Sequence, residues 1–155
     1  MTNPEFRFDE TPISPLMFIE ASAGTGKTYT LQRLVLRFIV EKSIPIESFL
    51  IVTYTEAATA ELSGRVREIL GRAVLGLSPG SESKLTEPER KEFKKLRDKW
   101  THDGITLEEA LDRVRRSLEE FDRCAIYTIH SFCRKMLESW AFSGGNPFEG
   151  EIGDD

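Results

Sequence analysis

The chain has 155 residues, of which 39% are hydrophobic and 30% are charged, with 21 basic against 26 acidic side chains. These values are typical of a soluble globular domain with a core of ordinary size, and they exclude wholesale disorder. No stretch free of Asp, Glu, Lys and Arg exceeds 10 residues, whereas a membrane-spanning helix needs about 20 apolar residues, so we expect no membrane segment. The net charge of -5 argues against a general polyanion binder but leaves room for a local nucleic-acid site.

The cysteine content argues against a disulfide framework and against a zinc site. Only Cys124 and Cys133 are present, and His102 and His130 are the only further soft ligands. The first ten residues mix acids with polar residues and contain no apolar run, so no secretion signal is predicted. We therefore expect two reduced thiols in a cytoplasmic protein.

The first elements in chain order are an arm, a strand and a helix. Residues 1–12 are expected to form a loose arm, and the apolar run at 16–20 indicates a buried strand. A glycine-rich segment follows at 21–28. Beyond it, apolar residues recur with the spacing of one helical stripe, namely Leu31, Leu34, Val35, Phe38 and Ile39. Pro45 is expected to end this helix.

A second strand and helix follow. The β-branched and aromatic residues at 49–55 predict a second buried strand. From Glu56 an apolar stripe predicts a long helix, which ends at the turn-forming residues 78–81.

The next stretch is highly charged, with 12 acids and 11 bases at positions 82–123. Two capping boxes, Thr86 with Glu89 and Thr106 with Glu109, predict the starts of two helices. Because the two signs of charge are interleaved, we interpret this stretch as a solvated helical insert packed on the core and not as a binding patch.

Residues 124–129 predict a third buried strand, and the segment after it predicts a last helix that ends before Gly144 and Gly145. Strands that alternate with helices favour an α/β fold, here a P-loop (RecA-like) parallel sheet with flanking helices and a charged helical insert. Three strands are few for such a fold, so we expect the chain to be an incomplete motor domain from a longer protein. The expected parts are an arm (1–12), a core (13–77 and 122–142), the insert (78–121) and, at 143–155, an acidic tail or the start of a missing subdomain.

The segment ASAGTGKT provides the strongest chemical signal because it lies between a predicted strand and a predicted helix, as a Walker A loop does. Its glycines allow backbone amides to approach phosphate oxygens, and the following helix directs its N-terminus at the anion. Lys27 is expected to reach the β and γ phosphates, and Thr28 to offer its hydroxyl to Mg²⁺. The predicted ATP-binding residues are Ala21, Ser22, Ala23, Gly24, Thr25, Gly26, Lys27 and Thr28. Ala21 stands where the strict pattern has glycine.

Phosphoryl transfer needs more than this loop. A second acid is expected at the end of another apolar strand, together with an arginine that neutralises the developing charge. Glu20 and Glu56 follow apolar runs, but neither has the required context. We therefore predict that the chain alone does not hydrolyse ATP.

Two further segments, VTYTEAATAEL at 52–62 and TIHSFCRKML at 128–137, occur in the order of helicase motifs. Together with ASAGTGKT they resemble superfamily 1 DNA helicases, and most specifically the RecB-like family of exodeoxyribonuclease V beta subunits. The resemblance covers residues 16–77 and 122–142.

This resemblance implies a RecA-like motor that uses ATP and Mg²⁺ to translocate 3′ to 5′ on single-stranded DNA and to unwind duplex ends. It also implies exonuclease activity in the longer parent, a role in recombinational repair of double-strand breaks, and RecC-like and RecD-like partner subunits. DNA contacts are implied for Thr53, Tyr54, Thr55, Thr128, His130 and Ser131. The family's adenine-reading Gln has no counterpart near Ser14.

Other interpretations stay open. Tyr54 and His130 are also compatible with core positions, and Ser131 with an N-cap. The chain as a whole is also compatible with a small P-loop nucleotide or metabolite kinase, whose lid would need arginines such as Arg113, Arg115 and Arg116. A non-catalytic nucleotide-binding module is the third alternative.

Overall fold

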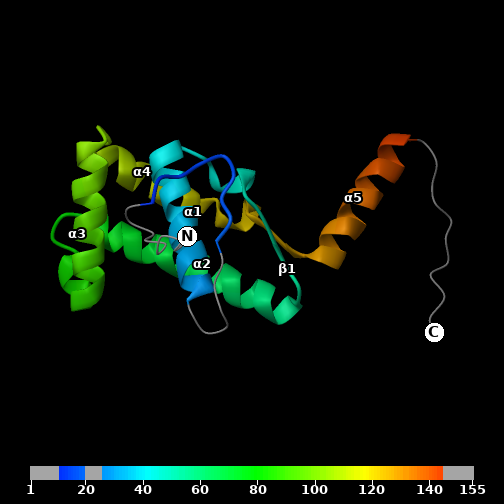
Figure 1. Cartoon of the computed structure of the whole chain (residues 1–155), viewed down its shortest axis with the longest axis horizontal. Coiled ribbons are helices and arrows are strands. Elements are labelled where there is room, and N and C mark those ends of the chain that lie inside the picture. Colours follow the sequence, from blue (N-terminus) through cyan, green and yellow to red (C-terminus); the bar gives the residue numbers. More distant parts are fainter. Residues whose placement is uncertain (1–10, 20–25, 145–155) are drawn as a thin grey trace, which may run out of the picture.

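A computed structural model describes residues 11–19 and 26–144, which are mostly helical and contain one two-stranded sheet (Figure 1). The α-helices and strands are α1 (Lys27–Lys42), β1 (Leu50–Thr53), α2 (Glu56–Leu77), α3 (Glu87–His102), α4 (Leu107–Glu119), β2 (Ala125–Thr128) and α5 (Ile129–Gly144). Three short 3-10 helices lie at Ile46–Ser48, Glu82–Lys84 and Phe121–Arg123.

The two strands are parallel, as the alternation of strands and helices predicts. Their register pairs Leu50 with Ala125 and Thr53 with Thr128. Helices α2, α3 and α4 form the connection between them. Because the strands are parallel and in register, both carboxyl ends lie at the same edge of the sheet.

The predicted strand at 16–20 is wrong for residues 16–19. The backbone there is not in a strand, and Leu16 and Phe18 are 88% and 92% exposed. Residue 20 lies outside the described residues. A strand needs a paired neighbour for its backbone groups, and within the described residues β1 pairs with β2 alone.

The other two strands exist but are shorter and more exposed than predicted. The strand predicted at 49–55 spans Leu50–Thr53, and the one at 124–129 spans Ala125–Thr128. Leu50 and Val52 are 50% and 42% exposed. Successive side chains of a strand point to opposite faces, so one face of the sheet is covered by α2 and the other remains partly open.

Helices α1 and α2 confirm the predicted spans. Helix α1 ends at Lys42, and its C-cap residue Ser43, two residues before Pro45, has a left-handed φ of 54°. Its predicted apolar stripe is buried only in part, and the polar residues Arg33 and Arg37 are buried too. The reason is that α1 packs against α2 and α4 and also bonds to α3 through side chains, so more than one of its faces is covered.

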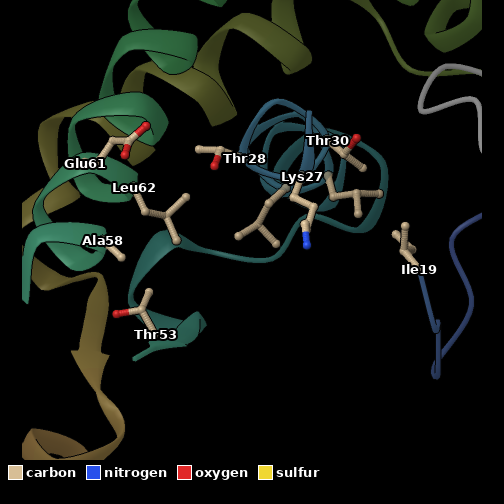
Figure 2. A pocket seen from close by; sticks show the side chains of 10 residues that line it. Ile19, Lys27, Thr28, Thr30, Thr53, Ala58, Glu61 and Leu62 are labelled. Atoms are coloured by element: carbon tan, nitrogen blue, oxygen red, sulfur yellow. The ribbon is translucent and has the colours of Figure 1, made fainter. Parts of the chain in front are cut away.

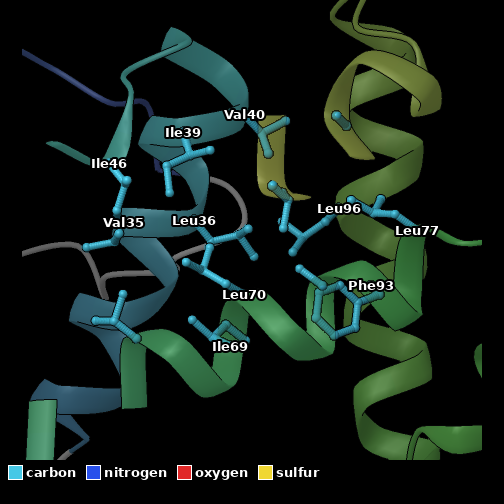
Figure 3. Packing of buried hydrophobic residues seen from close by; sticks show 14 of the residues in the cluster. Val35, Leu36, Ile39, Val40, Ile46, Ile69, Leu70, Leu77, Phe93 and Leu96 are labelled. Carbon is cyan, nitrogen blue, oxygen red and sulfur yellow. The ribbon is translucent and has the colours of Figure 1, made fainter. Parts of the chain in front are cut away.

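The charged insert contributes large residues to the core (Figure 3). Both predicted capping boxes are present at the starts of α3 and α4. Phe93, Leu96 and Trp100 of α3 are nearly or fully buried against α1 and α2. The interleaved charges correctly indicate a solvated outer face, and the inner face belongs to the same hydrophobic cluster as α1 and α2.

Helix α5 begins directly at the end of β2 and extends away from the four packed helices (Figure 1). It packs mainly against β2 and β1, and a side chain in its first turn also bonds to α2. Leu137 and Trp140 on it are 68% and 72% exposed. None of the helices within the described ranges is both long and apolar enough to cross a membrane.

Candidate nucleotide and nucleic-acid site

The described part of the phosphate loop begins at Gly26. Residues Ala21, Ser22, Ala23, Gly24 and Thr25 lie outside the described residues. Gly26 has a left-handed φ of 81°, which side chains other than glycine rarely tolerate, and its carbonyl accepts the first helical bond of α1 from Thr30 at 2.9 Å. Lys27 and Thr28 are the first two residues of α1, where backbone N–H groups lack helical acceptors and attract anions.

Lys27 and Thr28 line a cavity of about 310 Å³ between α1, the end of β1 and α2 (Figure 2). Thr53 and Glu61 line the same cavity. Its remaining lining is mostly apolar and consists of Ile19, Thr30, Leu31, Leu34, Ala58 and Leu62. The described lining thus combines a cation, an acid and hydroxyl groups with apolar side chains, as small-molecule sites often do.

Sequence reasoning missed Glu61. It lies inside a helix, whereas an acid of this kind is expected at the end of an apolar strand, and only the packing of α2 against α1 brings it to the cavity. Its carboxylate lies 3.8 Å from Arg65 on the same helix, and its side chain is 61% exposed. Hydroxyl and carboxylate oxygens are ligands that suit Mg²⁺, so the donor set of Thr28 and Glu61 fits this ion.

A second group of side chains ties the start of α1 to α3. The Arg33 Nε and Nη2 groups donate to the two oxygens of Glu92 at 2.5 and 2.7 Å, and the Tyr29 hydroxyl donates to the same carboxylate at 3.1 Å. The Arg33 guanidinium also lies 3.2 Å from the centre of the Tyr29 ring. Burial, with a further contribution from Glu92, raises the pKa of Tyr29 although Arg33 opposes it. Side chains of α3, in the insert, are therefore bonded to α1, the helix that follows the phosphate loop.

The three insert arginines that a kinase lid would need are engaged elsewhere. Arg113 donates to the Val40 carbonyl at 2.5 Å, and Arg116 pairs with Asp112 at 2.7 Å. None of the three lines the cavity as the structure describes it. The fold therefore offers no support for the kinase alternative.

The segments predicted to contact DNA meet at the carboxyl edge of the sheet. Thr53 and Thr128 are register partners at the ends of the two strands. Tyr54 is 86% exposed, and His130 is exposed at the start of α5. Both core interpretations, for Tyr54 and for His130, are therefore wrong.

The threonines at this edge form side-chain hydrogen bonds that fix the ends of the strands and the starts of the helices that follow. Thr55 is the N-cap of α2 and accepts a hydrogen bond from the Ala58 N–H at 3.1 Å. Thr53 Oγ1 lies 2.6 Å from Thr59 Oγ1. Thr128 is 5% exposed, and its Oγ1 accepts the Ser131 N–H at 3.1 Å. The cap of α5 is thus Thr128, and the interpretation of Ser131 as the N-cap is wrong.

A side-chain bond joins the two predicted DNA-contacting segments. The Ser131 hydroxyl donates to Oε1 of Glu56 at 3.2 Å, from the first turn of α5 to the first residue of α2. The sequence alone does not reveal this contact, because its partners are 75 residues apart.

Comparison with known proteins adds to this geometry. The model of the UvrD/REP helicase N-terminal domain matches residues 3–151. The RecBCD enzyme subunit RecB of Haemophilus influenzae is 36% identical over 158 residues, which cover 91% of this chain and 12% of that protein. The Escherichia coli RecB subunit is 33% identical over 93% of this chain and 12% of its own length, and that of Mycobacterium tuberculosis is 34% identical over 86% and 12%. The chain thus spans about an eighth of the length of these relatives.

Proposed function

Because the chain belongs to the UvrD/REP helicase N-terminal domain family, we propose that it is the ATP-binding portion of a RecB-like DNA helicase subunit. The observation that carries this proposal is the position of Lys27 and Thr28. They open α1 directly after the left-handed Gly26 and line a cavity that α2 closes.

In this proposal the chain's own residues bind and orient the triphosphate. The first N–H groups of α1 and the Lys27 ammonium contact phosphate oxygens, and Thr28, with Glu61 nearby, holds Mg²⁺. When bound, ATP and Mg²⁺ supply the transferable phosphoryl group and neutralise its charge. The described elements are then part of a P-loop (RecA-like) sheet.

The carboxyl edge of the sheet is the proposed contact with single-stranded DNA. Ligands of parallel α/β sheets bind outside the carboxyl ends of the strands. The exposed Tyr54 ring offers a base a stacking surface, and His130 and Ser131 offer polar groups to a phosphate. Thr53, Thr55 and Thr128 shape this edge through the contacts described above.

For the longer parent protein we propose the activities that the family resemblance implies. These are ATP-driven 3′ to 5′ translocation, duplex unwinding and exonuclease action in recombinational DNA repair, within a cytoplasmic complex with RecC-like and RecD-like subunits. The similarity to subunits named for the RecBCD enzyme supports this proposal.

The test of the DNA contact compares two substitutions of Tyr54 in a titration with a fluorescent oligothymidylate at low salt. Tyr54→Ala is expected to weaken binding by roughly tenfold, because stacking of one base on an aromatic ring is worth about 1–3 kcal/mol. Tyr54→Phe keeps the ring and is expected to bind as the wild type does. At physiological salt we expect even the wild type to bind more weakly than micromolar, since the near-neutral surface offers few phosphate contacts. Equal binding by Tyr54→Ala and wild type would contradict the proposed contact.

A further inference from the structure

Glu56 places a negative charge at the edge where phosphates are proposed to bind. It is the first residue of α2, and its carboxylate accepts the Ser131 hydroxyl at 3.2 Å. An anion there repels phosphates. The proposed DNA contact therefore does not by itself explain why an acid lies at this point.

The direction of the hydroxyl groups at this edge is fixed by Glu56. An ionised carboxylate can only accept hydrogen bonds, so the Ser131 hydroxyl is the donor between them. The Thr128 hydroxyl in turn donates to Ser131 Oγ at 2.8 Å. Both hydroxyl protons are therefore used within the chain, and Ser131 has no proton for a phosphate while it is bonded to Glu56.

We propose that Glu56 takes the place of a nucleic-acid phosphate when the chain is free of DNA, and that a phosphate must displace it from Ser131. Both groups are anions that only accept, and both are favoured near the first turn of a helix such as α2. The row of donors from Thr128 through Ser131 is thus already oriented toward an anion before DNA arrives. This inference rests on the proposed function, because it concerns the same DNA-binding edge.

The exchange makes Glu56 a specificity-determining residue. A small anion gains the bond to Ser131 only by displacing the carboxylate, so its net gain is small. A DNA strand that also stacks on Tyr54 gains a second contact that Glu56 does not oppose. The edge therefore selects single-stranded nucleic acid over isolated phosphate.

The test measures binding of a fluorescent oligothymidylate to the chain by anisotropy at low salt. Glu56→Gln is expected to bind about fivefold more tightly than the wild type, because a nearby like charge is removed and the bond that holds Ser131 becomes a weaker, neutral one. Glu68→Gln is the matched control. It makes the same change of charge at an exposed position of the same helix, about 18 Å further along at the helical rise, and is expected to change the affinity less than twofold.

A second pair of variants separates release of Ser131 from loss of charge. In a Ser131→Ala background no hydroxyl remains to be released, so the gain from Glu56→Gln is expected to fall below about twofold. Glu56→Ala, which removes the acceptor entirely, is expected to gain at least as much as Glu56→Gln. Thermal melting by circular dichroism confirms that each variant is folded.

The outcomes distinguish this inference from the function it rests on. Unchanged or weaker binding by Glu56→Gln, beside a weakened Tyr54→Ala, would overturn the role of Glu56 alone. The same gain with and without Ser131 would overturn the displacement. Unchanged binding by Tyr54→Ala would instead count against the proposed DNA-binding edge as a whole.

Discussion

At the scale of single residues, the least predictable feature is a charged cluster at the edge of the core. Arg37 is 1% exposed, and its Nε and Nη2 groups donate to the carboxylate of Glu41 at 2.7 and 2.8 Å. Trp100 donates its indole N–H to the same carboxylate at 3.1 Å, and Lys99 lies 3.0 Å away. A helix-period pattern places Arg37 beside Glu41 but does not indicate that α3 covers both.

Glu41→Gln is expected to destabilise the chain by about 3 kcal/mol, because the buried Arg37 charge then lacks its carboxylate partner. Urea unfolding followed by circular dichroism measures this change. Glu47→Gln, at an exposed position, is the control and is expected to change the free energy of unfolding by less than about 0.5 kcal/mol. Equal stability of the two variants would contradict the assigned role of Glu41.

The same variant also has an expected pH dependence. Burial raises the pKa of Glu41, but the hydrogen bonds from Arg37, Trp100 and Lys99 outweigh it and hold the pKa below its ordinary value of 4.5. A lowered pKa means that ionised Glu41 stabilises the fold above pH 4.5, and that this contribution is lost as the pH falls through the lower, folded-state pKa. The wild type is therefore expected to lose more stability than Glu41→Gln on acidification below pH 4.5.

At the scale of elements, the close approach of α2 and α3 depends on one glycine. A Cβ built on Gly76 would lie 2.5 Å from Cγ of Phe93, which is itself 2% exposed. In contrast, a Cβ on Gly64 of the same helix meets nothing within 4 Å. The two glycines therefore differ in packing while they share the same secondary structure.

Gly76→Ala is expected to lower the free energy of unfolding by about 1–3 kcal/mol, since overpacking a buried contact forces neighbouring groups to shift. Gly64→Ala is expected to raise it by about 0.5–1 kcal/mol, the ordinary preference for Ala over Gly in a helix. Thermal melts of both variants provide the comparison. Stabilisation by both substitutions would show that Phe93 does not pack against Gly76 as described.

The sequence predicted best those elements whose signals are local. The spans of α1 and α2 followed from apolar periodicity, and the starts of α3 and α4 from their capping boxes. The burial of the strands could not be predicted from the sequence, because it depends on neighbouring strands and layers that a run of apolar residues does not specify. In the same way a local motif singles out Gly26, Lys27 and Thr28 as candidates, whereas the position of Glu61 at the cavity and the bond between Glu56 and Ser131 arise from tertiary packing.

At the scale of the whole molecule, the described residues form one hydrophobic cluster from α1 to α4, and α5 extends from the sheet beside it (Figure 1). The cavity lined by Lys27 lies beside the end of β1. The Glu56–Ser131 bond lies at the carboxyl edge of the sheet. Thr53 at the end of β1 lines the cavity and also belongs to the carboxyl edge, so the proposed nucleotide site and the proposed DNA contact meet there. A shift of β1 or α2 would move groups of both sites together.

The chain alone is not expected to hydrolyse ATP, with or without single-stranded DNA. Among the described residues that line the cavity there is one lysine and one acid, whereas efficient phosphoryl transfer also relies on a positioned water and an arginine, which by itself is worth about 10³–10⁵ in rate. A phosphate-release assay measures the activity, with Lys27→Ala as the control for contaminating enzymes. Turnover that disappears in Lys27→Ala would show that a complete catalytic site lies within these residues.

The measurement that tests the proposed function most directly is a calorimetric titration of Mg-ATP into the wild type, Lys27→Ala and Lys42→Ala. Lys42 lies in the last turn of the same helix and is exposed, so its removal makes the same change of charge at the opposite end of α1. We expect Lys27→Ala to bind roughly 10- to 100-fold more weakly, because a hydrogen bond to a charged group is worth about 1.5–3 kcal/mol, and Lys42→Ala to bind as the wild type does. Equal affinities of Lys27→Ala and the wild type would contradict the assignment of this helix end as the triphosphate site.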